Sequence, residues 1–177
     1  LQQIIQENPD FKAVIVPHEV TKENLDEIIT FFKENQIELA RFTELKIDEK
    51  WDFKVLLVDT FGLLANLYAL GKMAYVGGGY GMGVNSVLEP AAHGCGVIFG
   101  PRHLNVVEAK KLIEFGGAAP ISNKDDIYAE LKNYIVSPEI NAKRGEKAKE
   151  MVGENLGASE KVLNVFNEYI ESEGKNG

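Results

Sequence analysis

A glycine-rich segment, residues 77–83, is the part of this sequence best suited to contact a ligand. It reads Gly-Gly-Gly-Tyr-Gly-Met-Gly and follows the apolar run Met73–Val76. Glycines allow positive φ and let a backbone approach a ligand closely. We expect a helix to follow from Asn85 to His93, and the amides at a helix N-terminus favour phosphate. The segment therefore predicts either a phosphate-binding loop or a tight strand-to-helix turn whose glycines serve packing. It is neither a Walker loop nor a dinucleotide fingerprint, because the Gly-Lys-Ser/Thr ending and the spaced acidic residue are both missing.

Glu89 is the second residue that points to a ligand. It follows Asn85 by one helical turn in the expected helix, so both side chains should lie on the same side, next to the loop. A carboxylate there can accept two hydrogen bonds from a ribose diol. The alternative is an acidic residue in a first helical turn, where the helix dipole favours it. Pro90 suits that first turn, where its missing N–H costs little.

The elements that must position these residues alternate between strand-like and helix-like. This alternation predicts an α/β fold with a parallel sheet flanked by helices. Residues 55–58 are all apolar, which predicts a strand buried on both faces. Thr21 is the expected N-cap of the helix that follows it. The expected strands are 12–16, 38–42, 55–58, 73–76, 97–100 and 118–121, and the expected helices are 1–7, 21–35, 61–70, 85–93, 106–115 and 124 to about 171.

Composition excludes several classes of protein. The 177 residues fit a single domain, residues 1–177, and the formal net charge of −8 argues against a nucleic-acid partner and against docking on an anionic membrane. One cysteine and three scattered histidines predict neither a disulfide framework nor a zinc site. The longest apolar runs are strand-sized, too short to span a bilayer. The chain opens without Met inside an amphipathic pattern, so we expect a piece of a longer protein. No strand precedes the first expected helix, so the first strand either lies outside the chain or is supplied by another segment.

Several motifs in one register resemble those of 3-deoxy-D-manno-octulosonic acid (Kdo) transferases. The resemblance extends from about Lys12 to Ile121. A glycine loop with Glu-Pro would by itself indicate only the broader GT-B class of nucleotide-sugar enzymes. The motifs that carry the resemblance are Pro17-His18, Asp59-Thr60-Phe61-Gly62, Gly77-Gly78, Asn85-x-x-Leu88-Glu89-Pro90-Ala91-Ala92-x-Gly94, Phe99-Gly100-Pro101 and Asn105.

This resemblance implies a GT-B fold of two Rossmann-like domains, with this chain as the C-terminal donor-binding half. It implies CMP-Kdo as the donor substrate, no cofactor, and a lipid A precursor as the acceptor in lipopolysaccharide biosynthesis. In the family, the acceptor site, the catalytic base and the membrane attachment belong to the N-terminal domain. We therefore expect no catalytic residue and no metal site in this chain, which would be inactive by itself. The whole protein is expected at the cytoplasmic face of the bacterial inner membrane.

The resemblance also assigns individual residues to the donor. Glu89 would hold the ribose, and Arg102 would clamp a phosphate or carboxylate, although the family often has His directly after Gly-Pro. Two further departures are Leu63 and Glu19, where the family commonly has an acidic and a basic residue, respectively. The phosphate would lie near Gly78, Gly79 and Asn85, and the cytidine near Pro17, His18, Phe61 and Gly62.

Other candidate residues have simpler interpretations. Arg102 could equally be a solvated loop charge. Asp59 could belong to the family motif, but we favour a helix N-cap. His18 and His103 are interpreted as loop hydrogen-bonding residues, and Cys95, between two glycines, as a buried small residue.

Two other functions remain open from the sequence. One is a GT-B donor domain specific for UDP-sugars, from a transferase or a UDP-sugar 2-epimerase. The other is a non-enzymatic, flavodoxin-like binding domain that takes no nucleotide.

Overall fold

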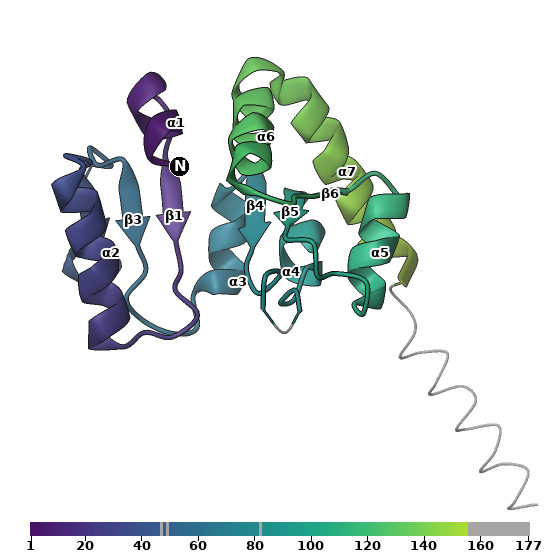
Figure 1. The fold of residues 1–177 in the computed structure, drawn as a ribbon, viewed down its shortest axis with the longest axis horizontal. Helices are drawn as coiled ribbons and strands as arrows, with labels where there is room; N and C mark the ends of the chain where they lie inside the picture. Colours follow the sequence, from purple (N-terminus) through teal and green to yellow (C-terminus); the bar gives the residue numbers. More distant parts are fainter. Residues whose placement is uncertain (47, 49, 82, 156–177) are drawn as a thin grey trace, which may run out of the picture. The chain divides into compact units, whose positions relative to one another are not determined.

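The computed structural model describes residues 1–155 except 47, 49 and 82. Contacts divide it into two compact units. The first unit contains residues 1–70 and 123–136, and the second contains residues 71–122 and the described residues from 137 on. Each unit has one three-stranded parallel sheet (Figure 1). The assignment of residues 1–177 to a single domain stays a prediction.

The sheet of the first unit has the order β1-β3-β2, so β3 is central. All three residues of β3 are buried, as predicted from its apolar run. Thr21 caps α2 as predicted, because its Oγ1 accepts the Asn24 N–H at 3.3 Å. Ile5, Phe32 and Val55 belong to the small core of this unit. Its elements are α1 (Gln2–Glu7), β1 (Ala13–Ile15), α2 (Lys22–Glu34), β2 (Leu39–Arg41), η1 (Phe42–Glu44), β3 (Val55–Leu57), α3 (Leu64–Leu67), η2 (Tyr68–Leu70) and α6 (Lys124–Val136).

The sheet of the second unit has the order β4-β5-β6, with β5 buried along its whole length. Helix α7 packs against both α4 and β5. The core gathers apolar side chains from the sheet, α4, α5 and α7, with Phe99 and Leu112 fully buried. The elements are β4 (Met73–Val76), α4 (Leu88–Ala92), β5 (Gly96–Phe99), α5 (Val107–Glu114), β6 (Ala118–Pro120) and α7 (Pro138–Asn155).

The strands and most of the helices lie where the sequence predicts them, and three helix boundaries differ. The helix expected from Asn85 begins at Leu88. The helix expected from Phe61 begins at Leu64, after Gly62 adopts a φ of +83°. The long helix expected from Lys124 is interrupted at Ser137, and Pro138 begins α7. Proline favours the first position of a helix and disfavours helical backbone in the residue before it. The expected helical residues 156–171 lie outside the described residues.

The described residues contain neither a membrane-spanning helix nor a group of metal-binding side chains. No described helix is long and apolar enough to cross a membrane. Nor does that part of the chain contain a group of three or more His, Cys, Asp and Glu side chains placed to hold a metal ion.

Candidate functional site

The glycine loop of the second unit is anchored in the core at both ends. Val76, at the end of β4, is 4% exposed, and Val84 and Val87 on the far side of the loop are 8% and 1% exposed. All three belong to the same apolar cluster. The sequence therefore fixes the entry and the exit of the loop by burial, and the polar backbone between them projects from the carboxyl end of β4. Ligands of parallel α/β sheets bind at this end of the strands.

Close backbone contacts explain why the loop needs glycine. Gly78 has a φ of +90°, and a Cβ on it would lie 2.3 Å from the Gly83 carbonyl oxygen. A Cβ on Gly79 would lie 2.6 Å from the Cα of Gly100, which follows β5. Neither position can hold a larger residue without moving backbone. The packing interpretation of these two glycines is therefore correct: their backbone lies against Gly83 and against Gly100, which follows β5.

Arg102 ties the loop down from the segment that follows β5. Its amide donates to the Gly79 carbonyl at 2.9 Å, and its guanidinium Nη1 donates to the Gly81 carbonyl at 2.8 Å. A guanidinium carries five N–H donors, so this contact leaves capacity for an anion. Arg102 is thus not a purely solvated charge, because it donates hydrogen bonds to the loop. Its predicted contact with the donor would come in addition to this structural role.

Within the described residues, most hydrogen bonds of the loop are accepted by its carbonyls, and two of its amides are left available. The Gly81 amide donates to Gly78 at 2.8 Å, and the Asn85 amide donates to Gly77 at 3.1 Å. Among the described residues, no hydrogen bond is donated by the amides of Gly78 or Gly79. Backbone amides in such a turn are suitable donors to an anion.

Asn85 and Glu89 are arranged differently from the prediction. Asn85 lies before α4, where its backbone N–H donates a hydrogen bond to the Gly77 carbonyl, so the two residues do not share a helical face. Its side chain nevertheless lies over the loop, because a Cβ on Gly78 would be 3.2 Å from its Oδ1. Glu89 is in the first turn of α4 and is exposed, so its carboxylate is not committed to the core. The structure thus brings Gly78, Gly79, Asn85 and Arg102 together at the loop, while no described contact links the Glu89 carboxylate to them.

The remaining predicted donor residues form a second group, in the first unit. Pro17 and His18 follow β1, and Phe61 and Gly62 follow β3. Because β1 and β3 are parallel neighbours, the two pairs lie at the same edge of the sheet. His18 is exposed, and Phe61 is 75% exposed, so its ring is accessible to a ligand.

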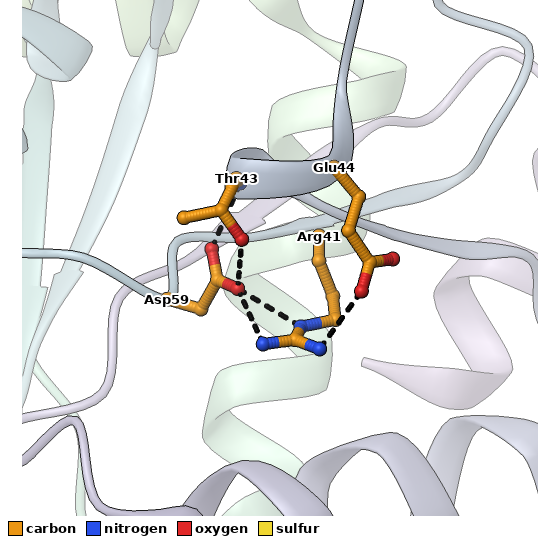
Figure 2. A network of polar contacts seen from close by, with 4 residues as sticks. All are labelled: Arg41, Thr43, Glu44 and Asp59. Carbon is orange, nitrogen blue, oxygen red and sulfur yellow. Dashed lines mark hydrogen bonds and ion pairs between the residues drawn. The ribbon is translucent and has the colours of Figure 1, made fainter.

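A polar network at the same edge was not predicted from the sequence (Figure 2). Asp59 is not the N-cap we favoured, because α3 begins after Leu63 without a side-chain cap. Instead its Oδ1 accepts the Thr43 amide at 3.0 Å, and its Oδ2 accepts the Thr43 hydroxyl at 2.6 Å. Arg41 adds Nε at 2.9 Å and Nη2 at 2.8 Å to Oδ2. The remaining terminal nitrogen of Arg41 contacts Glu44 at 2.8 Å.

The network sets the charge state of Asp59. Burial alone would raise the pKa of this carboxyl, but the hydrogen bonds from Thr43 and the charge of Arg41 outweigh it and hold the pKa below its usual value. The side chain of Asp59 is 0% exposed. A carboxylate in this position is tolerated because it is paired. The sequence pattern around Asp59 shows only that it follows a buried strand, which does not indicate its partners Thr43 and Arg41.

Two simpler interpretations are confirmed. Cys95 is fully buried, its Sγ contacts the Gly71 carbonyl at 3.6 Å, and burial raises the pKa of its thiol. His103 lies with Nδ1 3.3 Å from the Gly100 carbonyl oxygen, as expected for a loop hydrogen-bonding residue.

Curated Kdo transferases are similar to this chain in sequence. The 3-deoxy-D-manno-octulosonic acid transferase of Aquifex aeolicus is 36% identical over 107 residues, which cover 59% of this chain and 30% of that protein. The enzyme of the same name from Haemophilus influenzae is 25% identical over 171 residues, which cover 95% of this chain and 39% of that protein. The chain thus spans about a third of the length of these relatives. No protein-family model matches it.

A solved structure supports the fold. The C-terminal CMP-Kdo binding domain of WaaA from Acinetobacter baumannii superposes with a TM-score of 0.73 and 19% identity, covering 85% of this chain and 78% of that domain. The predicted α/β fold, a parallel sheet flanked by helices, is confirmed. The resemblance to Kdo transferases is confirmed by the sequence similarities.

Proposed function

We propose that this chain is the donor-binding domain of a glycosyltransferase that takes Kdo from CMP-Kdo and transfers it to a lipid A precursor. The observation that carries the proposal is the loop at residues 77–83, held by Arg102 and flanked by Asn85, in a chain similar to curated Kdo transferases. Transfer is proposed for the whole protein, because the chain spans about a third of its relatives. The acceptor site, the general base and contact with the inner membrane would then lie in the rest of that protein.

The proposed chemistry of the chain is donor binding and stabilisation of the leaving group. As CMP departs, negative charge develops on its phosphate, and fixed donors aimed at that charge lower the barrier. The amides of Gly78 and Gly79 are suited to this role, as are the guanidinium N–H groups of Arg102 other than the one that donates to Gly81. The Glu89 carboxylate would accept the ribose hydroxyls, and the surface after β1 and β3 would contact the base. No metal or cofactor is part of the proposal.

Calorimetric titration of the chain with CMP, UMP and UDP tests this function. We expect CMP to bind more tightly than UMP and UDP. Glu89→Gln should weaken CMP binding by about tenfold or more, because hydrogen bonds to a charged group contribute about 1.5–3 kcal/mol. Glu108→Gln is the matched control, since Glu108 is also an exposed acidic residue in a first helical turn of the second unit. It should leave CMP binding unchanged.

The other outcomes separate the competing functions. A preference for UMP or UDP would assign the domain to an enzyme of UDP-sugars. Binding of none of the three would favour a flavodoxin-like interaction domain. If Glu89→Gln and Glu108→Gln weakened CMP binding equally, Glu89 would act only as an acidic residue in a first helical turn and not through contact with the ribose.

A further inference from the structure

The polar network of Figure 2 lies immediately before residues assigned to the donor. Asp59 precedes Phe61 by two residues, and the chain then passes through Gly62, which has a positive φ of +83°. Arg41 ends β2 and pairs with Leu57 of β3, so the network joins the carboxyl ends of two neighbouring strands. Whatever fixes Asp59 therefore also fixes the start of the turn that presents Phe61.

The side chain of Asp59 is held by several contacts that are not part of the strand pairing. Four donor groups from Arg41 and Thr43 converge on one carboxylate at 2.6–3.0 Å. The Nε–Nη2 edge of a guanidinium fixes direction as well as distance, because both donors lie in one plane. A charge buried in an ion pair is often no more stabilising than apolar packing in its place, so stability by itself does not explain why the Asp59 carboxylate is buried here.

The turn beyond Asp59 has little of its own to define its position. Phe61 is 75% exposed, and Gly62 meets no atom within 4 Å of a built Cβ. The next helix, α3, is only four residues long and lacks a side-chain cap. An exposed aromatic ring on such a turn can contact a ligand in one defined position only if a nearby residue, here Asp59, fixes the backbone that leads to it.

We propose that Asp59, held by Arg41 and Thr43, is a positioning residue that sets the Phe61–Gly62 turn for the nucleoside of the donor. The inference rests on the proposed function, since it assumes that this turn contacts a cytidine nucleotide. Asp59 itself touches no ligand. It acts through the backbone that it shares with Thr60 and Phe61.

Paired substitutions at Thr43 test the inference while keeping the Arg41–Asp59 ion pair. Thr43→Val removes the 2.6 Å hydroxyl bond to Asp59, and Thr43→Ser retains it. In calorimetric titrations of the chain, we expect Thr43→Val to raise the Kd for CMP about fivefold to tenfold, because a less firmly held turn must be ordered when the nucleotide binds. Thr43→Ser should restore the Kd. Asp59→Asn should raise the Kd by tenfold or more. Glu44→Gln is the control, because Glu44 contacts Arg41 from an exposed position without touching Asp59.

A second readout separates positioning from a general loss of structure. The amide resonances of Phe61 and Gly62 should shift or broaden in Thr43→Val, while those of the glycine loop in the second unit stay in place. If the unmodified chain binds CMP and Thr43→Val and Asp59→Asn bind it with unchanged Kd, the inference is wrong and the proposed function survives. If the unmodified chain binds no nucleotide, the proposed function fails and the inference falls with it. Weakened CMP binding with undisturbed Phe61 and Gly62 resonances would also overturn the positioning role.

Discussion

At the scale of single residues, Asp59 places a charge where water cannot reach it. Its side chain is 0% exposed, and Arg41 and Thr43 supply the interactions that water would otherwise provide. Burial opposes ionisation of this carboxyl, but these partners more than offset it, so its pKa lies below the ordinary value of 3.8. A group with a depressed pKa stabilises the folded state fully above its unfolded pKa, and this contribution is lost as the pH falls through the folded pKa.

We therefore predict that acid removes more stability from the unmodified chain than from Asp59→Asn. At pH 7 the variant should be less stable by about 1–3 kcal/mol, because it leaves buried donors of the network poorly satisfied. This difference should shrink below pH 4. The measurement is urea unfolding at pH 7 and pH 3, followed by the fluorescence of Trp51, the single tryptophan, which lies in the same unit. A difference that stays constant across this range would show that Asp59 is protonated or unpaired at neutral pH.

The glycine loop offers a second prediction at this scale. Gly79→Ala places a methyl group 2.6 Å from Gly100 backbone, so it should destabilise the chain by about 1–3 kcal/mol and weaken CMP binding. Gly81→Ala is the control in the same loop, because its nearest atom, the Gly78 oxygen, is 3.6 Å away, an ordinary contact. Circular dichroism melts and CMP titrations of both variants measure the effect. Equal behaviour of the two variants would mean that the loop can move away from Gly100.

At the scale of elements, local signals predicted strands better than helix boundaries. The run Val55–Val58 predicted a strand buried on both faces, because a fully apolar run can be recognised without knowing its distant partners. The predicted start of α4 was wrong. The backbone N–H of Asn85 donates a hydrogen bond to the Gly77 carbonyl, so Asn85 belongs to the loop and the helix begins only at Leu88. The break before Pro138 was visible in the sequence and was missed, since the charged pattern continues across it.

The part of the polar network that could not be predicted depends on contacts between residues far apart in the sequence. The network of Asp59 involves Thr43 and Arg41, which are 16 and 18 positions away, so no local pattern indicates it. By contrast, the loop at Gly78 and Gly79 was found from composition alone, because close backbone packing demands glycine. The individual donor roles of the predicted residues stay predictions.

The seating of α7 gives a prediction for one element. A Cβ on Gly145 would lie 2.0 Å from the Gly94 carbonyl oxygen, so α7 touches the segment before β5 with bare backbone. Gly145→Ala should destabilise the chain by about 1–3 kcal/mol. Gly153, in the same helix, has no atom within 4 Å of a built Cβ, so Gly153→Ala should stabilise the chain by up to about 1 kcal/mol through helix propensity. Thermal unfolding of both variants by circular dichroism compares them. Stabilisation by both substitutions would mean that α7 does not pack closely on Gly94.

At the scale of the whole molecule, donor binding and sugar transfer should separate. The chain carries the residues assigned to the donor, whereas it spans only 30% and 39% of the lengths of the two relatives compared above. Inverting sugar transfer needs a general base on the acceptor hydroxyl, which the resemblance places in the other domain. The formal charge of −8 also makes this chain a poor platform for an anionic lipid acceptor.

We therefore predict that the 177-residue chain binds CMP but does not turn over CMP-Kdo. A CMP concentration 100-fold above Kd should raise the free energy of unfolding by about 2.7 kcal/mol, seen as a higher melting temperature. Release of CMP from CMP-Kdo in the presence of a lipid A precursor should stay at the uncatalysed rate, and the whole protein that contains this sequence should accelerate it. At the same CMP concentration, a Glu89→Gln variant with a tenfold higher Kd should keep only about 1.4 kcal/mol of this stabilisation, which separates specific binding from a general effect of nucleotide. Steady turnover by the chain itself would place the general base and the acceptor site within these 177 residues, and the division of labour proposed for the two domains would then be wrong.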